Sequence, residues 1–590
     1  MHTLSHVKIE NYKSIKSLEL NLTGYTPIVG YNNAGKSNIL EAIDWFLSNS
    51  YGMDESAFRS LDYPPTVTGR IKGVTEELLD ELDDRHKRQI EDYVVDGIII
   101  FRFRQLKPSG RAGDRELMVR DPEVEDDEAE EAFTDNPAGI SNALTKLFPK
   151  SIFIRAMEDA TEDVSSNKRS TTIGKLISEI TDPVKEEHKN DIEEAIGKLN
   201  NLFTADGEER VESFKEFDTI ADNNIADFFP GISLKLHVPP PTIDDIFKQG
   251  TVKFSERGDD LREFSLLGHG AQRSIQMGLV KMLSEYGVNE EGLSRKFLLI
   301  EEPELFLHPK GILVLRNALR KLAKSGYQVL FATHSPLVIT KDDIADTILI
   351  RKSTEEGTYR LNSLRESVAR VIDEHDKQAD VLFELTNSTK LLFADKAVLV
   401  EGKTENDFLP SLYQIISEKE DNEKSIAFIP LNGSGGMIKS AEILQEMGIP
   451  QSMIVDLDFC FQIAWNTLLE EDDEDILAFI ELVREYQDEG GYGIAENGLP
   501  KKNNGVKASD AYSLIATKGD AEPLINNLKD KMLALNYWVW SKGDVENMLG
   551  IEVKNEYRAK LMEIANSQDW EGVIDESDKV KELFEWVNDL

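Results

Sequence analysis

The stretch GYNNAGKS, residues 30–37, constrains this chain more than any other feature. It fits the pattern G-x-x-x-x-G-K-[S/T], continues from an apolar, strand-like run at 25–32 and precedes apolar residues at helical spacing between Ile39 and Leu47. In such a strand, loop and helix the backbone N–H groups wrap phosphates, the lysine neutralises phosphate oxygens and the serine hydroxyl reaches Mg²⁺. The pattern predicts a nucleotide site formed by Gly30, Asn32, Asn33, Ala34, Gly35, Lys36, Ser37 and Asn38.

A second part of that site is expected where acidic residues end an apolar strand. The stretch KFLLIEEPE (296–304) places Glu301 and Glu302 after four apolar residues. Glu301 would hold magnesium and Glu302 would orient or activate the attacking water, although both could instead be surface acids at a strand end. Lys36 and Glu301 are 265 positions apart. A compact nucleotide-binding core needs far less, so we expect a large insertion that splits one domain into two halves.

A different set of carboxylates follows this domain. VLVEGKTEND (399–408) puts Glu401 at the end of an apolar strand and Glu405 one helical turn later. MIVDLD (453–458) ends in Asp456 and Asp458, which strand alternation would direct to the same side. Four carboxylates at adjacent strand ends repel one another unless cations bind, so the pattern predicts one or two Mg²⁺ or Mn²⁺ ions. A lone D-x-D is common on surfaces; only the combination favours a metal site.

The overall charge limits how this chain meets nucleic acid. With 67 basic and 109 acidic residues the net charge is −42, which argues against binding DNA through bulk electrostatics. Any DNA contact is therefore expected to be local. The segment LPKKNNGVK (499–507) offers Lys501, Lys502 and Lys507 to phosphates, or is simply a solvated loop.

Cysteine usage and hydropathy exclude several further classes of protein. The single cysteine, Cys460, rules out a disulfide framework and zinc sites of the Cys-x-x-Cys type, and is expected to be a buried small hydrophobe. No run of about eighteen apolar residues occurs, which predicts no membrane segment and a cytoplasmic protein.

Several motifs, taken in order, resemble a known family. LLGHGAQRS (266–274), IEEPELFLHP (300–309) and ATHSP (332–336) are similar to ABC ATPases of the SMC and Rad50 branch, and in particular to the overcoming-lysogenization-defect (OLD) nucleases. The resemblance implies that two copies sandwich ATP, with Ser265, Gly268 and Gly270 acting on the partner's nucleotide and His334 as a switch histidine. Gln105 is the candidate for the Q-loop glutamine.

The carboxylate segments resemble the Toprim fold of topoisomerases, primases and OLD nucleases. By that resemblance KGDVE (542–546) supplies a third acidic element, Asp544 and Glu546, beside Glu401, Glu405, Asp456 and Asp458. The family also uses a late lysine; Lys579 is the preferred candidate, with Lys542 and Lys560 as alternatives.

The resemblance implies an α/β chain in which a helical insertion splits an ABC ATPase domain and a Rossmann-like Toprim domain follows. The expected boundaries are 1–160 and 233–390 for the two ATPase halves, 161–232 for the dimerising insertion, and 391–590 for Toprim. The implied function is a metal-dependent DNA endonuclease controlled by ATP, acting in anti-phage defence.

The implied partners are DNA, a second copy or a dimer of dimers, and an accessory subunit such as a helicase-like protein or a retron reverse transcriptase with its msDNA. The alternative is an ATP-driven DNA-binding protein, like an SMC protein or a recombination mediator, with an inactive Toprim domain. A primase or topoisomerase activity is a third hypothesis. Strand passage by a topoisomerase needs a catalytic tyrosine, and no motif in the chain identifies one.

Overall fold

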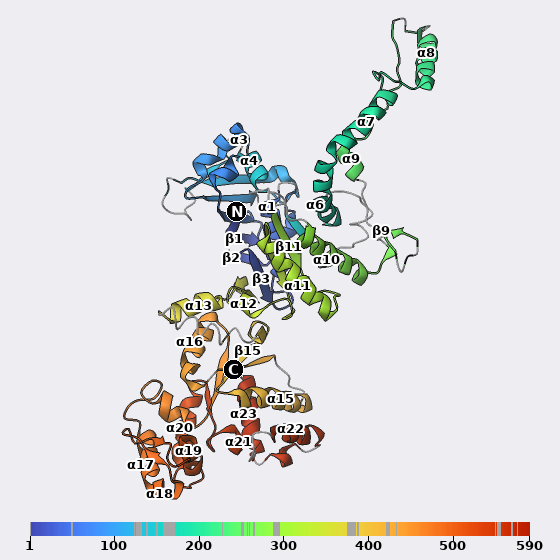
Figure 1. Cartoon of the computed structure of the whole chain (residues 1–590). Coiled ribbons are helices and arrows are strands. Elements are labelled where there is room, and N and C mark those ends of the chain that lie inside the picture. Colours follow the sequence, from blue (N-terminus) through green and yellow to red (C-terminus); the bar gives the residue numbers. More distant parts are fainter. Residues whose placement is uncertain are drawn as a thin grey trace. The chain divides into compact units, whose positions relative to one another are not determined.

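In the computed structural model the chain divides into two compact units (Figure 1). The first unit comprises 1–28, 32–338 and 352–359; the second comprises 29–31, 339–351 and 360–590. The structure describes the whole chain except residues 1, 49–50, 123, 125–131, 137–139, 149–150, 157–171, 227, 230, 249–252, 256–257, 259, 264–265, 287–295, 374–384, 386–388, 421–424, 432, 549, 551–555, 568–569, 575 and 590.

The largest sheet has twelve strands in the order β7-β6-β5-β4-β1-β2-β14-β13-β3-β12-β11-β8. One end is antiparallel, as in the pairing of β1 with β2 and β4, whereas β11 runs parallel to β12 and β8. The strands are β1 (Thr3–Tyr12), β2 (Ile15–Asn21), β3 (Tyr25–Gly30), β4 (Thr66–Lys72), β5 (Ile98–Gln105), β6 (Arg115–Arg120), β7 (Phe133–Asp135), β8 (Ile152–Ile154), β11 (Lys296–Glu301), β12 (Tyr327–Thr333), β13 (Ile348–Ser353) and β14 (Gly357–Arg360).

Helix α1 (Lys36–Leu47) packs on one face of this sheet, against β1, β4, β11 and β12. Its aromatic residues are buried there, and the Phe46 ring stacks on Phe101 of β5 with centroids 4.6 Å apart. Gly69 of β4 permits this packing, because a Cβ at that position would lie 2.3 Å from the Phe46 ring. The helix that follows the glycine-rich loop is thereby fixed on the sheet.

Helices flank the strands of the first unit, and three of them, between residues 172 and 226, fall within the range 161–232 in which an insertion is expected. Within that region α6 contacts β8 and α10, whereas α7 has no buried residue, as expected for a charged helix that leaves the core. The helices are α2 (Glu76–Leu79), α3 (Asp84–Ile90), α4 (Ile140–Leu147), α6 (Thr172–Glu187), α7 (Lys189–Phe203), α8 (Glu212–Ala226), α9 (Ile243–Lys248), α10 (His269–Tyr286) and α11 (Pro309–Lys324); β9 (Lys253–Phe254) and β10 (Arg262–Glu263) form a separate hairpin.

The second unit is built on a parallel four-stranded sheet with the order β16-β15-β17-β20. Both faces of β15 are buried: Ala397 and Leu399 belong to one apolar cluster and Val398 and Val400 to the other, which explains its continuous apolar sequence. The strands are β15 (Lys396–Val400), β16 (Ile426–Pro430), β17 (Gln451–Val455) and β20 (Tyr537–Val539), with β18 (Gly493–Ile494) and β19 (Pro500–Lys501) as a small hairpin.

Helices cover both faces of this sheet, as a parallel sheet requires. Helices α15, α16 and α20 contact its strands directly. The helices of this unit are α12 (Lys341–Ile344), α13 (Leu364–Val371), α15 (Lys403–Glu420), α16 (Met437–Met447), α17 (Glu474–Glu485), α18 (Gln487–Gly490), α19 (Ala508–Ala516), α20 (Glu522–Leu533), α21 (Val545–Met548), α22 (Tyr557–Asn566) and α23 (Ser577–Asp589). Among the described residues, no helix is both long and apolar enough to cross a membrane.

Candidate functional site

The glycine-rich loop joins β3 to α1, as the sequence predicts. Gly35 stands immediately before the helix with φ of 104°, a left-handed conformation that glycine adopts without strain. Lys36, the first helical residue, is buried, and burial lowers its pKa to about 8 while Glu302 and Glu304 oppose the shift. A buried ammonium gains most from an anion placed beside it, so the loop is suited to bind phosphate.

A hydrogen-bond network that no sequence motif predicts supports the back of this loop. Thr358 of β14 donates from Oγ1 to the Ala34 carbonyl at 2.9 Å and contacts Ser14 Oγ at 2.7 Å. Asn38 Nδ2 also donates to Ser14 Oγ, at 2.7 Å. A Cβ on Gly35 would lie 2.2 Å from Thr358 Oγ1, so the second glycine is required by close packing as well as by its φ. Asn32, Asn33 and Ser37 are exposed at the same loop.

The acidic pair ends β11 as predicted, and its two carboxylates have different surroundings. Glu301 is buried, and its Oε2 accepts a hydrogen bond from the Ala156 N–H at 3.0 Å. Glu302 adopts a φ of 42°, and its Oε1 lies 3.5 Å from His334 Nε2. Burial, followed by the Lys36 charge, lowers the pKa of His334. Lys36, Glu302 and His334 therefore influence one another electrostatically within a single site.

Two further residues of this site escaped the sequence analysis. Glu304 Oε1 accepts from Thr333 Oγ1 at 2.7 Å and from the His334 N–H at 2.8 Å, which ties the two strand ends together. Arg273, in the GHGAQRS stretch on α10, donates to the carbonyls of Arg155 at 2.9 Å and Glu302 at 3.0 Å. The helix that follows the signature-like turn is thus bound directly to the end of β11.

The remaining candidates of this domain are the signature-loop residues and the Q-loop glutamine, and they differ in their surroundings. Gly268 is exposed with open space around its Cβ direction, and Gly270 lies near Phe306. Ser265 lies outside the described residues. The Gln105 side chain is buried, accepts from the Met53 N–H at 3.1 Å and donates to the Lys107 carbonyl at 2.8 Å, so it holds local backbone; its role as the Q-loop residue stays a prediction.

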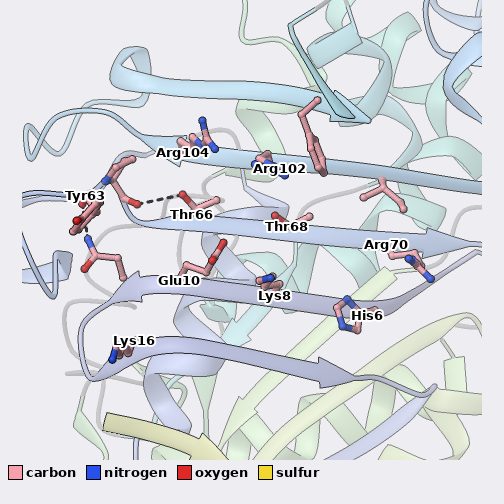
Figure 2. Close-up of a pocket in the computed structure, with 14 residues that line it drawn as sticks. His6, Lys8, Glu10, Lys16, Tyr63, Thr66, Thr68, Arg70, Arg102 and Arg104 are labelled. Atoms are coloured by element: carbon pink, nitrogen blue, oxygen red, sulfur yellow. Dashed lines mark hydrogen bonds between the residues drawn. The ribbon is translucent and has the colours of Figure 1, made fainter. Parts of the chain in front are cut away.

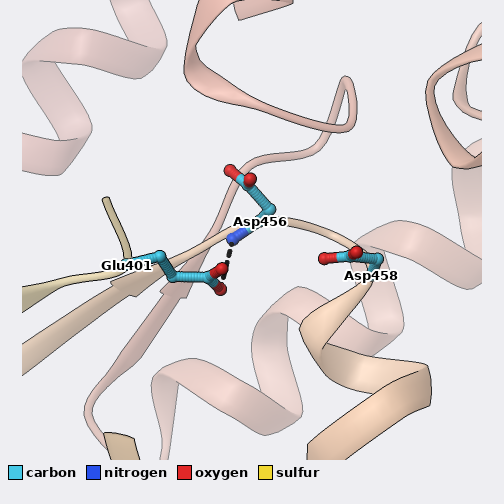
Figure 3. Close-up of side chains that lie close together, drawn as sticks. All are labelled: Glu401, Asp456 and Asp458. Carbon is cyan, nitrogen blue, oxygen red and sulfur yellow. Dashed lines mark hydrogen bonds between the residues drawn. The ribbon is translucent and has the colours of Figure 1, made fainter. Parts of the chain in front are cut away.

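The second unit brings three predicted carboxylates together at the ends of its central strands. One carboxylate oxygen each from Glu401, Asp456 and Asp458 lie within 4.8 Å of one another (Figure 3). Glu401 follows β15, and its Oε1 accepts from the Asp456 N–H at 3.1 Å. The Oδ1 atom of Asp456 is buried and has no hydrogen-bond partner in the part of the chain that the structure describes. An orphaned carboxylate oxygen among other carboxylates is the environment that a cation would satisfy.

Asp456 and Asp458 do converge, but not through the strand alternation that we predicted. Strand β17 ends at Val455, and both residues lie in the turn after it, so period-two alternation does not orient them. The ladder stops there because the Asp456 N–H donates to the Glu401 side chain. Gln462 Nε2 donates to Asp458 Oδ2 at 3.1 Å.

Electrostatic repulsion within this cluster is strong. Burial, then Asp458 and Glu405, raise the pKa of Glu401 to about 8. Burial and the neighbouring carboxylates, Asp544 among them, also raise the pKa values of Asp456 and Asp458. The charged groups that raise these pKa values are all carboxylates, so a bound cation would relieve the repulsion.

The third acidic segment lies beside the cluster. The Gly543 carbonyl accepts from the Leu457 N–H at 2.8 Å, which places Asp544 next to the turn that carries Asp456 and Asp458. Asp544 Oδ1 also accepts from the Asn547 N–H at 2.8 Å, at the start of α21, where Glu546 is half-buried. Glu405 is buried on α15 and acts on Glu401 and Asp456 through its charge.

The lysine candidates occupy ion pairs outside this trio. Lys579 Nζ lies 3.0 Å from Glu582 on α23, Lys542 lies 2.6 Å from Glu576, and Lys560 lies 3.9 Å from Glu563. The choice of catalytic lysine stays a prediction. Lys501, Lys502 and Lys507 are exposed around the β18–β19 hairpin.

Comparisons with known proteins identify the two domains that carry these candidate sites. Residues 3–94 and 99–339 match the AAA ATPase domain model, and residues 392–458 match the TOPRIM domain of overcoming lysogenization defect protein-like proteins. The chain is 33% identical to the Old nuclease of Escherichia phage P2 over 605 positions, covering 99% of each protein.

Two further relatives are more distant. The chain is 24% identical to the OLD nuclease of Thermus scotoductus, over 77% of this chain and 82% of that protein. It is 23% identical to endonuclease GajA of Bacillus cereus strain HuB5-5, over 73% and 70%. These matches confirm the family and the fold class predicted from the motifs. The chain belongs to the OLD family of nucleases, in which an ATPase domain is followed by a Toprim domain.

Proposed function

We propose that this chain is a divalent-metal-dependent DNA endonuclease whose Toprim carboxylates cut phosphodiesters under the control of an ATPase dimer. The observation that carries the proposal is the cluster of Glu401, Asp456 and Asp458, in which Asp456 Oδ1 is buried without a hydrogen-bond partner among the described residues. The endonuclease name of the GajA relative supports the reaction class.

The donor set fits a hard divalent cation. Carboxylate oxygens are the ligands that Mg²⁺ and Mn²⁺ prefer, and Glu401, Asp456 and Asp458 would hold the first ion, with Glu405, Asp544 and Glu546 able to complete a second site. A bound ion supplies Lewis-acid charge to the phosphate and lowers the pKa of a water nucleophile. The protein orients the ligands: the Asp456 N–H fixes the Glu401 carboxylate, and Gln462 fixes that of Asp458. Lys579 is proposed as the late lysine of the reaction.

The ATPase site is proposed to bind ATP with Mg²⁺ and to hydrolyse it. Lys36 would contact the phosphates, Ser37 and Glu301 the magnesium, and Glu302 the attacking water, with His334 beside it. Gly268 and Gly270, together with Ser265, are proposed to contact the nucleotide of a second copy. Arg273 follows these glycines on α10 and donates to the Glu302 carbonyl. Contact with a second copy could therefore change the position of Glu302 at the end of β11.

We infer that the helical insertion takes part in assembly. Its outer part exposes large apolar side chains that a monomer has no reason to display: Phe217, Ile220, Phe228 and Phe229 are 49%, 62%, 78% and 62% exposed. The proposed boundaries remain 1–160, 161–232, 233–390 and 391–590. A dimer or dimer of dimers, an accessory subunit and a role in anti-phage defence are proposed from the family resemblance.

A plasmid assay tests the proposed function. Supercoiled DNA is incubated with the protein and Mg²⁺ or Mn²⁺, with and without ATP, beside Glu401→Gln, Lys36→Ala and the exposed control Glu470→Gln. We expect Glu401→Gln to abolish nicking and linearisation while ATP hydrolysis continues, Lys36→Ala to abolish nucleotide binding and alter the ATP response, and Glu470→Gln to behave as wild type. Equal cutting by wild type and Glu401→Gln would refute the assignment.

A further inference from the structure

Polar side chains that line a cavity of the first unit pair with their neighbours. Figure 2 shows this cavity, of about 570 Å³, on the antiparallel strands of the large sheet. There Lys8 Nζ lies 3.0 Å from Glu19, and Thr66 Oγ1 donates to the Pro64 carbonyl at 3.2 Å. Most buried polar groups in folded proteins have such partners, so a buried group without one requires an explanation.

The hydroxyl group of Tyr512, on α19 of the second unit, is such an exception. Tyr512 is 1% exposed, and its hydroxyl oxygen has no hydrogen-bond partner in the part of the chain that the structure describes. Its ring stacks on Phe461 and Phe479, with centroids 5.3 Å and 6.1 Å away. A phenylalanine at this position would complete the aromatic stack equally well and would leave no buried hydroxyl unpaired. The hydroxyl therefore does not serve the packing.

This hydroxyl lies beside the turn that carries Asp458, one of the three carboxylates in Figure 3. Phe461, on which the Tyr512 ring stacks, donates its backbone N–H to the Asp458 carbonyl at 3.1 Å. Burial, followed by the Asp458 charge, raises the pKa of Tyr512, and the Gln462 amide opposes the shift. The hydroxyl therefore keeps its proton and is a neutral hydrogen-bond donor next to this turn.

The residue between the hydroxyl and the cluster is Gln462. Its side chain donates from Nε2 to Asp458 Oδ2 at 3.1 Å, and its backbone N–H donates to the Asp458 carbonyl at 2.9 Å. It belongs to a π-helical turn, Cys460–Ala464, a rare conformation that is frequent at functional sites. The Nε2 bond leaves the amide oxygen of Gln462 to accept from a further donor.

Helix α19 is also fixed to the third acidic segment. Ser513 Oγ accepts from Asn547 Nδ2 at 3.0 Å, and the Asn547 N–H donates to Asp544 Oδ1 at 2.8 Å. A Cβ on Gly543 would lie 2.3 Å from Ser513 Oγ, so the helix and the segment pack closely. Neighbouring residues of one helix therefore reach two of the three acidic segments.

We propose that Tyr512 is a positioning residue of the metal centre: its hydroxyl donates to the Gln462 amide oxygen and so fixes the Asp458 carboxylate for a divalent cation. The proposal rests on the proposed function in taking a divalent cation as the ligand of the carboxylates. Hydrogen bonds that orient metal ligands are commonly as important as this, since their loss weakens metal binding by about 10- to 100-fold. The unpaired hydroxyl of the metal-free fold then gains its partner when a cation orders the amide.

Two tyrosine-to-phenylalanine variants separate positioning from packing. Tyr512→Phe removes the unpaired hydroxyl, whereas the matched control Tyr492→Phe removes a hydroxyl that donates to the Val483 carbonyl at 2.8 Å. Both tyrosines are 1% exposed and lie in the second unit. Binding of Mn²⁺ to the full chain is measured by electron paramagnetic resonance of the free ion, without DNA or nucleotide. Urea denaturation in EDTA measures the stability of each variant.

Tyr512→Phe should weaken Mn²⁺ binding by about 10-fold and should unfold at a urea concentration no lower than wild type. Tyr492→Phe should show the opposite pattern, with wild-type Mn²⁺ affinity and a lower urea midpoint, because it loses a buried hydrogen bond. Gln462→Ala tests the same path at an exposed side chain outside the aromatic stack, and should weaken Mn²⁺ binding at least as much. The double variant Tyr512→Phe/Gln462→Ala should lose no more affinity than Gln462→Ala alone, because both groups act on Asp458 through one path.

Wild-type Mn²⁺ affinity in Tyr512→Phe overturns the inference, as do additive losses in the double variant or a wild-type protein that binds no Mn²⁺. If wild type binds Mn²⁺ and the variants behave as expected, but the protein never cuts plasmid, the proposed endonuclease function fails while this inference stands.

Discussion

Replacing Glu401 by glutamine should stabilise the metal-free protein, because it removes one charge from a cluster that repels itself. The folded-state pKa of about 8 exceeds the ordinary 4.5, so the folded carboxyl holds its proton more tightly than the unfolded one. The stability that this group contributes is fully present below about pH 4.5 and is lost as the pH rises to about 8. At 1.36 kcal/mol for each pKa unit, the loss is about 1 kcal/mol at pH 5 and about 4 kcal/mol at pH 7.5.

Glutamine keeps the oxygen that accepts from the Asp456 N–H and does not titrate. In EDTA, we therefore expect Glu401→Gln to exceed wild type in unfolding free energy by a margin that grows by about 3 kcal/mol between pH 5 and pH 7.5. Urea denaturation followed by tryptophan fluorescence measures it, since Trp465, Trp538, Trp540, Trp570 and Trp586 all lie in the second unit. Glu470→Gln, at an exposed position, controls for the loss of a charge.

Divalent metal should narrow the difference in stability between the variant and wild type at pH 7.5. Manganese at 100 times its Kd stabilises a protein that binds it only when folded by about 2.7 kcal/mol, and the glutamine variant should gain less because it lacks one ligand. A variant no more stable than wild type in EDTA at pH 7.5, or one with an undiminished response to manganese, would refute the account of the cluster.

Two further predictions concern the nucleotide loop. ATP affinity should fall as the pH rises above about 8, because Lys36 is then neutral and binds phosphate only after taking up a proton. Fluorescent-nucleotide titrations between about pH 7 and 9 measure this affinity. A Kd that stays constant over this range would contradict the prediction. Gly35→Ala should abolish nucleotide binding in the same titration, because its Cβ would collide with Thr358 Oγ1. The control Gly113→Ala, which has open space around its Cβ, should bind normally. Retained binding by Gly35→Ala would show that Thr358 moves aside and would contradict the prediction.

Local patterns predicted the parts of this structure that depend on neighbouring residues. An apolar strand followed by a glycine-rich or acidic segment can be recognised within about ten residues. This pattern predicted the loop before α1, the acids at the end of β11, and Glu401 after β15. Three segments of carboxylates were predicted to converge, and the structure brings those of two segments, Glu401 with Asp456 and Asp458, within 4.8 Å of one another.

Contacts between segments that are distant in the sequence could not be predicted in this way. Thr358 lies in β14, which pairs with β2, and no sequence motif marks it as a neighbour of the glycine-rich loop. Glu304 and Arg273 act through hydrogen bonds whose partners are fixed only by packing.

The contact of Thr358 with Ala34 spans 324 positions and has a consequence for biosynthesis. At about 5 to 20 residues per second, the ribosome needs on the order of tens of seconds to add the strand that braces the loop after the loop itself has emerged. During that interval the nascent chain contains the glycine-rich loop but lacks the strand that supports it. The loop can reach its full affinity for ATP only after Thr358, near the end of the first unit, has been translated.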